Sequence, residues 1–345
     1  MNTPLPSTAL CHQTTIPFTN DGSGFETALD VLRKSPQGVM SIDCFAPPSQ
    51  LEEVRDVLVA SGLDAPGMFV HSLDGAEGGM QITTCPAHLQ AVPIFDRQRL
   101  VGHVLEDAQV RYCLLSGLVP EDRTASPEVQ TEDIFRMAER ALASVGMDFR
   151  NVARTWFYND RILDWYDGFN RVRTSYFRAH GISVLPASTG IGAANSTGSA
   201  LVVKILAVDP RGAFRALPSP LQCEATDYGS SFSRAIEIAS PNGRAISVSG
   251  TASIEPGGKT IFPDDPLSQI ETTMEVVSAL LEAAGSSLGE TTRAIAYFRD
   301  PSHIEFWKRH ARSRSLEDLP ILLTACTVCR DDLLFEIELD VAGHA

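Results

Sequence analysis

Apolar residues recur at helical spacing along residues 266–284, at Ile270, Met274, Val277, Leu280 and Leu281. This spacing is typical of an amphipathic helix that lies on a sheet. Gly285 follows the last apolar position, and a glycine at such a place commonly ends a helix. Short apolar runs before and after it indicate strands at 245–248 and 292–298, a helix near 301–314, and strands at 321–328 and 333–341.

An earlier part of the chain repeats this order. It predicts a helix at residues 132–145, a strand at 152–158, a helix at 162–180 and a strand at 200–208. Both copies carry a Ser-Gly strand end, a glycine after the first helix and an aspartate after the next strand: Ser116-Gly117, Gly146 and Asp160, then Ser249-Gly250, Gly285 and Asp300. Each copy therefore has the order β–α–β–α–β, and the chain contains an internal repeat.

The repeat predicts an α/β (α+β) fold of two tandem modules, each a mixed sheet with helices packed on one face. The first domain is expected to span residues 1–215, including a divergent N-terminal extension, and the second to span 216–345. The strand order of the first hundred residues stays open. Gly190-Ile191-Gly192 lacks the rest of a nucleotide-binding fingerprint, so we interpret it as a turn before a strand.

Composition and charge exclude several classes of protein. Apolar residues make up 43% and charged residues 21% of the 345 residues, as in soluble globular proteins. The formal net charge is −15, and no run of Lys or Arg occurs, which argues against nucleic-acid binding. The chain has no long apolar stretch of the kind that spans a membrane, and its first residues do not resemble a secretory signal.

The seven cysteines are scattered, an odd number that favours a reducing cytoplasm over a disulfide scaffold. Cys326 and Cys329 form a CxxC pair, but no second pair or His-x-x-x-His motif accompanies it, so neither zinc nor another metal is expected. A redox role is rejected as well, because the pair follows an apolar run predicted as a strand rather than opening a helix.

Three sequence runs in the second copy resemble a RidA/YjgF domain: Ile246-Ser247-Val248-Ser249-Gly250, Leu281-Glu282-Ala283-Ala284-Gly285-Ser286-Ser287-Leu288 and Glu336-Ile337-Glu338. Two such copies, together with the runs at residues 165–173 (WYDGFNRVR) and 228–235 (YGSSFSRA), resemble the chorismatase family. The resemblance implies a pseudo-trimer-like core in a monomer with internal pseudo-symmetry, and a cytoplasmic, cofactor-free enzyme of secondary metabolism. The implied substrate is chorismate.

One departure from RidA proteins narrows the chemistry. RidA imine deaminases hold the substrate carboxylate with the arginine of a Pro-Ala-Arg motif. Here the corresponding places are Pro186-Ala187-Ser188 and Thr324-Ala325-Cys326, and neither has the arginine. The sequence therefore argues against imine deamination and favours the chorismatase branch.

Arginines and small residues in the family-like runs are the candidate substrate ligands. Chorismate has two carboxylates, and the planar guanidinium of arginine suits a carboxylate. Arg173 and Arg234 lie in these runs, so we assign one to each carboxylate. Tyr166 and Tyr228 are candidate hydroxyl donors, with a role as core aromatics as the alternative. Gly250 and Ala252 are expected to line the substrate ring, because small side chains allow a close approach.

A glutamate is the candidate catalytic acid. Cleavage of the enol ether requires a proton on the terminal methylene carbon, and a buried carboxyl group keeps its proton near neutral pH. Glu336 lies in an apolar strand, and alternation places Glu338 on the same face, so a coupled pair sharing one proton is possible. The family pattern assigns the acid to Glu336, with Glu338 as the alternative.

The resemblance assigns Cys329 to the subtype that makes 3-hydroxybenzoate. In that reading Cys329 shapes and dries the pocket, so that a ring hydroxyl of the substrate rather than water attacks the intermediate. The expected products are pyruvate and 3-hydroxybenzoate, together with some 4-hydroxybenzoate. A chorismate hydrolase that yields trans-dihydroxycyclohexadiene carboxylate is the near alternative, and a non-catalytic module that binds a small carboxylate is the distant one.

Overall fold

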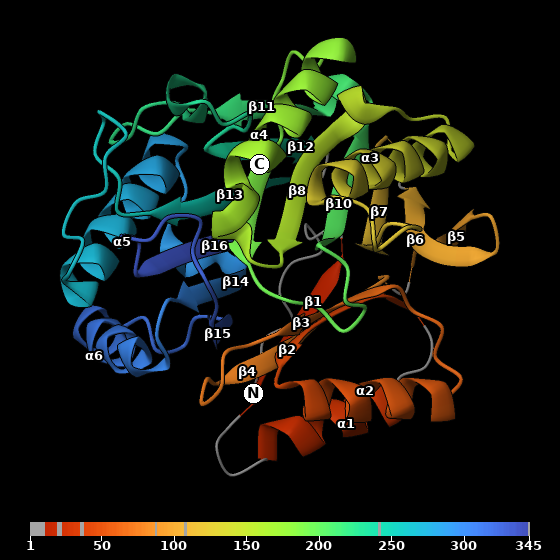
Figure 1. Cartoon of the computed structure of the whole chain (residues 1–345), viewed down its shortest axis with the longest axis horizontal. Helices are drawn as coiled ribbons and strands as arrows, with labels where there is room; N and C mark the ends of the chain where they lie inside the picture. The colour runs from red at the N-terminus through yellow and green to blue at the C-terminus, as the bar shows by residue number, and fades with distance from the viewer. Residues whose placement is uncertain are drawn as a thin grey trace.

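The computed structural model of the chain describes residues 11–18, 23–34, 38–86, 88–106, 109–240 and 243–343. These residues form three mixed β-sheets, each covered by a pair of α-helices (Figure 1). We call residues 11–84, 92–209 and 214–343 the first, middle and third units. None of the described helices is long and apolar enough to cross a membrane.

The third unit has six strands in the order β11-β12-β13-β16-β14-β15. Its elements are β11 (Phe214–Leu217), β12 (Ala235–Ser240), β13 (Gly243–Ala252), α5 (Pro266–Ala283), β14 (Thr291–Phe298), α6 (Ile304–Arg314), β15 (Ile321–Ala325) and β16 (Phe335–Gly343). Strands β14 and β15 are parallel, because α6 connects them, and the other neighbours are antiparallel. Helix α5 begins where Asp265 accepts a hydrogen bond from the backbone of Ser268.

The middle unit has the same strand order, β5-β6-β7-β10-β8-β9. Its elements are β5 (Val92–Asp96), β6 (Arg99–Glu106), β7 (Arg111–Leu118), α3 (Pro127–Ser144), β8 (Val152–Asn159), α4 (Ile162–Ala179), β9 (Ala187–Gly192) and β10 (Leu201–Asp209). Short 3-10 helices occupy connections within and between these two units, at Phe149–Asn151, Arg211–Ala213, Ala225–Tyr228, Leu288–Glu290 and Pro301–His303. The predicted repeat is therefore confirmed.

The first unit is a shorter version of the same arrangement. It contains β1 (His12–Phe18), α1 (Ser23–Lys34), β2 (Val39–Ala46), α2 (Pro48–Ala60), β3 (Gly67–His71) and β4 (Gly78–Thr84). The strand order β1-β4-β2-β3 matches that of the last four strands in each of the other sheets, with β2 and β3 parallel. The structure thus adds a third copy, lacking the first two strands, to the two modules that the sequence predicted.

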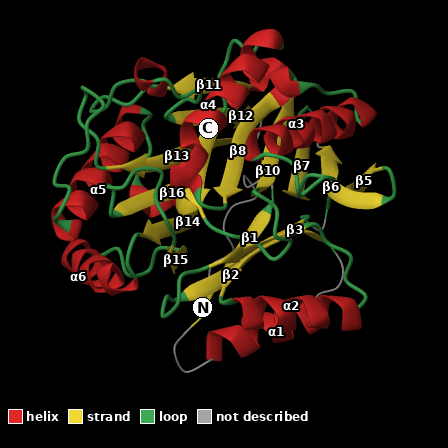
Figure 2. Cartoon of the chain, in the orientation of Figure 1, coloured by secondary structure: helices red, strands yellow, loops and turns green. Residues whose placement is uncertain are grey.

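Each sheet buries one face under its own helices and the other face against the remaining two sheets. The helices lie toward the outside of the molecule and the strands toward the middle (Figure 2). The helix-side cores belong to single units, whereas a central cluster takes Phe45, Val70, Tyr158, Val202, Ile295, Tyr297 and Leu322 from all three. Burial of this shared cluster holds the three units together.

Strand registers identify equivalent positions at the three interfaces. Glu336 pairs with Tyr297, Val202 with Tyr158, and Gly79 with Phe45. The three aromatic rings pack together at the centre, with centroids 5.3 to 6.3 Å apart. Two residues further along each strand are Glu338, Lys204 and Gln81, again equivalent.

These latter residues each bind the neighbouring unit. The Arg154 Nη2 of the middle unit donates to Glu338 Oε2 of the third at 2.7 Å, and the Arg293 Nε of the third donates to Gln81 Oε1 of the first at 2.7 Å. The Lys204 Nζ of the middle unit lies 2.6 Å from Asp43 Oδ2 of the first. The three interfaces therefore share one plan with different side chains.

Two local predictions were wrong. Gly190-Ile191-Gly192 is not a turn but the end of β9, which pairs in parallel with β8. The strand predicted at 321–328 ends at Ala325, because the chain then leaves its own sheet and Thr327 pairs with Gly192 of the middle unit. The predicted domain boundary at 215 falls within β11.

Candidate active site

A cavity between the middle and third units gathers all eight residues that the sequence singled out. It encloses about 530 Å³ of empty space, including solvent at its mouth, and is lined by Tyr166, Phe169, Arg173, Ser188, Gly190, Tyr228, Phe232, Arg234, Gly250, Ala252, Ile254, Cys329, Arg330, Leu333 and Glu336. Helix α4 and strand β9 supply the residues of the middle unit. Strands β13 and β16 and the loops of the third unit supply the others.

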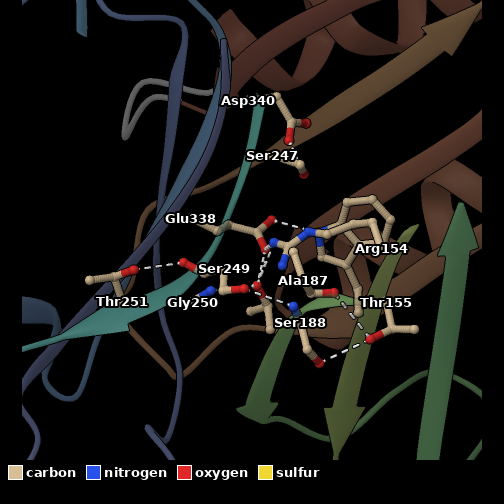
Figure 3. Close-up of polar contacts among 12 residues, drawn as sticks. Arg154, Thr155, Ala187, Ser188, Ser247, Ser249, Gly250, Thr251, Glu338 and Asp340 are labelled. Carbon is tan, nitrogen blue, oxygen red and sulfur yellow. Dashed lines mark hydrogen bonds and ion pairs between the residues drawn. The ribbon is translucent and has the colours of Figure 1, made fainter. Parts of the chain in front are cut away.

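Strands β9 and β13 meet across the interface and form one wall of the cavity. The backbone N–H of Ser188 donates to Ser249 Oγ at 2.9 Å, and that of Gly250 donates to Thr189 Oγ1 at 3.1 Å. Ser249 Oγ in turn donates to the carbonyl of Ser233 at 2.6 Å. These contacts join the start of β9 to the end of β13, so the site depends on both units (Figure 3).

Arg173 presents an incompletely paired guanidinium to this cavity. It is 2% exposed, its Nη2 donates to Asn170 Oδ1 at 2.7 Å, and its Nη1 lies 3.3 Å from Ser188 Oγ. The buried Nε has no hydrogen-bond partner among the described residues. A buried cation that keeps a free donor is a suitable partner for an anion, so the geometry suits a carboxylate.

Arg234 and Arg330 lie around Tyr228 in the same cavity. The two guanidinium carbons lie 5.4 and 5.3 Å from the centroid of the Tyr228 ring. Arg234 Nε and Nη2 both donate to the carbonyl of Cys223, which fixes its orientation. Arg330 Nη1 donates to the carbonyl of Gly258 at 2.7 Å. The cavity thus has three guanidinium groups, one more than the sequence predicted.

The two tyrosines keep their protons. Burial raises the pKa of Tyr166, although the charge of Arg173 opposes that shift. Burial also raises the pKa of Tyr228, and the Arg234 charge opposes it. Both hydroxyls are therefore neutral hydrogen-bonding groups on the cavity wall rather than acids at neutral pH.

Glu336 is the carboxyl group that faces the cavity. It is 4% exposed, and none of the described residues donates a hydrogen bond to it. Burial and the negative charge of Glu338 raise its pKa to about 8, and the charge of Arg154 acts in the opposite direction. Gly250 leaves the space that this carboxyl fills, because a Cβ there would overlap Glu336 Oε1. Glu336 therefore keeps a proton at neutral pH.

Glu338 does not line the cavity and is fully buried between the units. Burial alone would raise its pKa, but the charges of Arg293 and Arg154 and the hydrogen bond from Thr189 lower it. Figure 3 shows its carboxylate directed toward Arg154. The pKa values of the two glutamates are thus shifted in opposite directions, and Glu336 is the one of the two that lines the cavity.

Cys329 forms an apolar part of the wall with Ala252, Ile254 and Leu333. Burial and the charge of Glu336 raise the pKa of its thiol to about 12. Cys326 is also a free, buried thiol, with a pKa that burial raises to about 12. Neither sulfur is a thiolate near neutral pH, so Cys329 acts here as a small apolar surface rather than as a nucleophile.

Several residues of the site escaped the sequence argument. Arg330 directly follows Cys329, and this adjacency was the available signal. Phe169 and Phe232 flank Arg173 with their rings, at 4.9 and 5.7 Å from its guanidinium carbon. Arg154 and Thr189 carry no local motif, because their role arises from contacts across the interface.

No group of three or more His, Cys, Asp or Glu side chains within the described ranges is arranged to hold a metal ion.

A solved structure matches over nearly the whole chain. A chorismatase, whose crystal structure was determined at 1.08 Å resolution, superposes with a TM-score of 0.65 and 19% identity, over 97% of this chain and 100% of that one. This chain has the chorismatase fold.

Smaller proteins match part of this chain. A putative endoribonuclease L-PSP from Entamoeba histolytica matches with a TM-score of 0.32 and 19% identity, over 37% of this chain and 98% of that one. A YjgF/YER057c/UK114 family member from Mycobacterium tuberculosis matches with a TM-score of 0.29 and 22% identity, over 37% and 98%. No family model and no curated protein matches the sequence.

Proposed function

We propose that this chain cleaves chorismate and releases pyruvate, with Glu336 as the general acid. The observation that carries the proposal is a neutral carboxyl group in a cavity that also holds Arg173, Arg234 and Arg330. Chorismate has two carboxylates and an enol ether, so it needs cationic groups for binding and an acid for reaction. The chorismatase fold supports the same assignment.

In the proposed first step Glu336 transfers its proton to the methylene carbon of the enolpyruvyl group. The C=C electron pair forms the new C–H bond, and the ether oxygen stabilises the resulting oxocarbenium ion. Glu336 becomes a carboxylate near this cation, which is an electrostatically favourable product of the transfer. Arg173 and Arg234 would hold the two carboxylates, and Arg330 is available to either of them.

The second step of the proposed reaction has two alternative outcomes, which differ in the group that attacks. In the first outcome the ring hydroxyl oxygen bonds to the neighbouring ring carbon that carries the ether, the bond from that carbon to the ether oxygen breaks, and pyruvate leaves with the ether oxygen. The hydroxyl proton returns to Glu336. The new oxygen then stays on the carbon that carried the ether, its bond to the other ring carbon breaks, and loss of a ring proton with protonation of the oxygen gives 3-hydroxybenzoate, without net consumption of water. Attack by water instead gives trans-dihydroxycyclohexadiene carboxylate and pyruvate. We propose the first outcome, because Cys329, Ala252, Ile254 and Leu333 form an apolar wall that would keep water from the intermediate.

The deciding experiment is incubation of the purified protein with chorismate. Pyruvate is measured enzymatically, and the second product is identified by mass and ultraviolet absorption. Equimolar pyruvate and 3-hydroxybenzoate support the proposal, with 4-hydroxybenzoate as a minor product. A non-aromatic diol would select the hydrolase, and unchanged chorismate would leave the non-catalytic binding module.

A pair of variants tests the acid in the same assay. Glu336→Gln keeps the shape of the side chain and removes its transferable proton, so pyruvate release should fall by at least about 100-fold. Glu275→Gln, on the exposed side of α5, is the matched control and should retain activity. Turnover near the wild-type rate in Glu336→Gln would show that another group is the acid.

A further inference from the structure

We propose that Glu338 is a positioning residue for the acid: its ionised carboxylate, anchored by arginines from two units, keeps the proton on Glu336. The inference rests on the proposed function and adds a residue that does not touch the substrate cavity. It requires that Glu338 be an anion and that its charge raise the pKa of Glu336. It also requires that this effect be distinguishable from a contact that only holds the units together.

The contacts of Glu338 leave it no place for a proton. Arg154 Nη2 donates to Oε2 at 2.7 Å, and the Thr189 hydroxyl donates to the same oxygen. Trp156 Nε1 donates to Oε1 at 3.1 Å, and Arg293 Nη2 donates to that oxygen as well. Indole and guanidinium groups are donors only, so every contact favours the carboxylate over the acid.

Glu336 is the group in the cavity whose pKa the charge of Glu338 raises. Glu336 and Glu338 are two residues apart on β16, so both side chains lie on the same face of the strand. Their exposed fractions are 4% and 0%. Two carboxylates in a weakly polarisable interior repel each other, and the one without donors takes up the proton. Glu338 has four donors from the surrounding strands, whereas none of the described residues donates to Glu336.

Other charged groups around Glu336 act with or against this effect. Arg154 on β8 lowers its pKa, and Arg173, Arg234 and Arg330 line the same cavity. Cys329, Tyr166 and Tyr228 also line it, and burial raises the pKa of each, so these groups are neutral. Glu338 is therefore the anion that offsets the cations around the acid.

Thr189 connects the anion to the shape of the site. Its hydroxyl donates to Glu338 and accepts hydrogen bonds from Arg154 Nη2 at 2.7 Å and from the Gly250 backbone at 3.1 Å. Gly250 in turn borders the carboxyl of Glu336. The same cluster thus sets the charge beside the acid and the position of the backbone against which the acid rests.

A purely adhesive role is the competing explanation. The equivalent residues Lys204 and Gln81 also bind a neighbouring unit, so this position holds units together at every interface. If the contact only held the units together, Glu338 and Arg154 variants would both lose stability and activity, with no opposite shifts in the pKa of Glu336. The proposed electrostatic role instead predicts opposite effects for the two partners of one contact, Glu338 and Arg154.

The experiment compares Glu338→Gln with Arg154→Met. Removing the anion should lower the pKa of Glu336 by about one unit or more, and removing the cation should raise it, because each charge acts with its own sign. The alkaline limb of pyruvate release from chorismate should therefore move to lower pH in Glu338→Gln and to higher pH in Arg154→Met. A carbon-13 titration of the Glu336 carboxyl should give the same two shifts in the absence of substrate.

The readouts separate the possible failures. Shifts in the same direction, or no shift in either variant, would overturn the role of Glu338. If the wild-type protein leaves chorismate intact, the proposed function fails, while the carbon-13 titration still decides the coupling between the two glutamates. If one variant does not fold, the titration of the other decides, because each has its own predicted sign.

Discussion

The proton on Glu336 links the proposed catalysis to folding. Its pKa is raised from 4.5 to about 8 in the native state, chiefly by burial and then by the charge of Glu338. Between these two pH values the native protein holds a proton that the unfolded chain has released. This stabilising contribution is complete below about pH 4.5, and it is lost as the pH rises through about 8.

The residue scale therefore gives a prediction for stability. Between pH 5 and 8 the free energy of unfolding should depend less on pH in Glu336→Gln than in the wild type. The difference in slope should reach up to about 1.4 kcal/mol per pH unit. Urea unfolding at pH 5, 6.5 and 8 measures this difference. Parallel pH profiles for the two proteins would contradict a raised pKa at Glu336.

A second prediction at this scale concerns Cys329. Replacing Cys329 by Ala or Val changes the apolar wall around the intermediate, so the product mixture should shift toward the hydrolytic diol. Cys326→Ala is the matched control, because Cys326 is buried in the central cluster and does not line the cavity. Product ratios from chorismate provide the measurement, and an unchanged ratio for Cys329→Ala would assign the subtype to another residue.

At the scale of elements, the site depends on the close approach of β9, β13 and β16. Gly250 in β13 is the point of contact, because a side chain there would occupy the place of the Glu336 carboxyl. Gly190 in β9 lines the same cavity, but a Cβ there would meet nothing within 4 Å. Gly250 therefore leaves room for the Glu336 carboxyl, whereas Gly190 only leaves open space in the cavity.

This difference predicts the effects of two alanine variants. Gly250→Ala should displace the acid and lower kcat by at least about tenfold, while the protein stays folded. Gly190→Ala adds the same methyl group to the cavity without touching Glu336, so its effect should fall on KM. Steady-state kinetics with chorismate distinguish the two, and an unaltered kcat in Gly250→Ala would show that the carboxyl has room to move.

The same elements explain what the sequence could predict. The helical stripe of α5 and the Ser-Gly strand ends revealed the repeat, because both are local patterns. Strand β9 was missed, because Ala187–Gly192 consists mainly of small and flexible residues that become a strand through pairing with β8 and packing against the third unit. The first unit was missed for a related reason, since it lacks the two strands that open the other copies and carries none of their motifs.

The candidate site followed the same division. Residues in family-like runs, such as Arg173 and Glu336, were assigned from sequence and line one cavity. Arg154 lies in an ordinary strand pattern, and its partner Glu338 is 184 positions away along the chain. The periodicity of the sequence does not predict such a pair, because the contact forms only when two separate sheets pack against each other.

At the scale of the whole molecule, the three interfaces carry different electrostatic pairs on one plan. Lys204 and Asp43 join the middle and first units, with exposed side-chain fractions of 4% and 1%. A buried ion pair contributes little beyond a well-packed apolar pair, but breaking it leaves one charge without a partner. The contact is therefore sensitive to single replacements.

This contact predicts a non-additive stability effect. Asp43→Asn should destabilise the protein by about 3–5 kcal/mol, because Lys204 loses its counter-ion. The double variant Asp43→Asn with Lys204→Met should recover part of that loss, since no uncompensated charge remains. Urea denaturation of the two single variants and the double variant measures the coupling, and additive losses would show that the pair does not hold these units together.

Because the three units belong to one chain, a residue at one interface can change without the equivalent residues at the other two interfaces changing. In an assembly of identical subunits, a replacement at the position of Glu336 would occur three times, and so would the cost of burying an acid. In this chain the same position holds Val202 and Gly79 at the other two interfaces, and Leu322 packs against Gly79. Two interfaces can therefore be packed for stability alone, while the third can hold the buried carboxyl group that the proposed reaction needs.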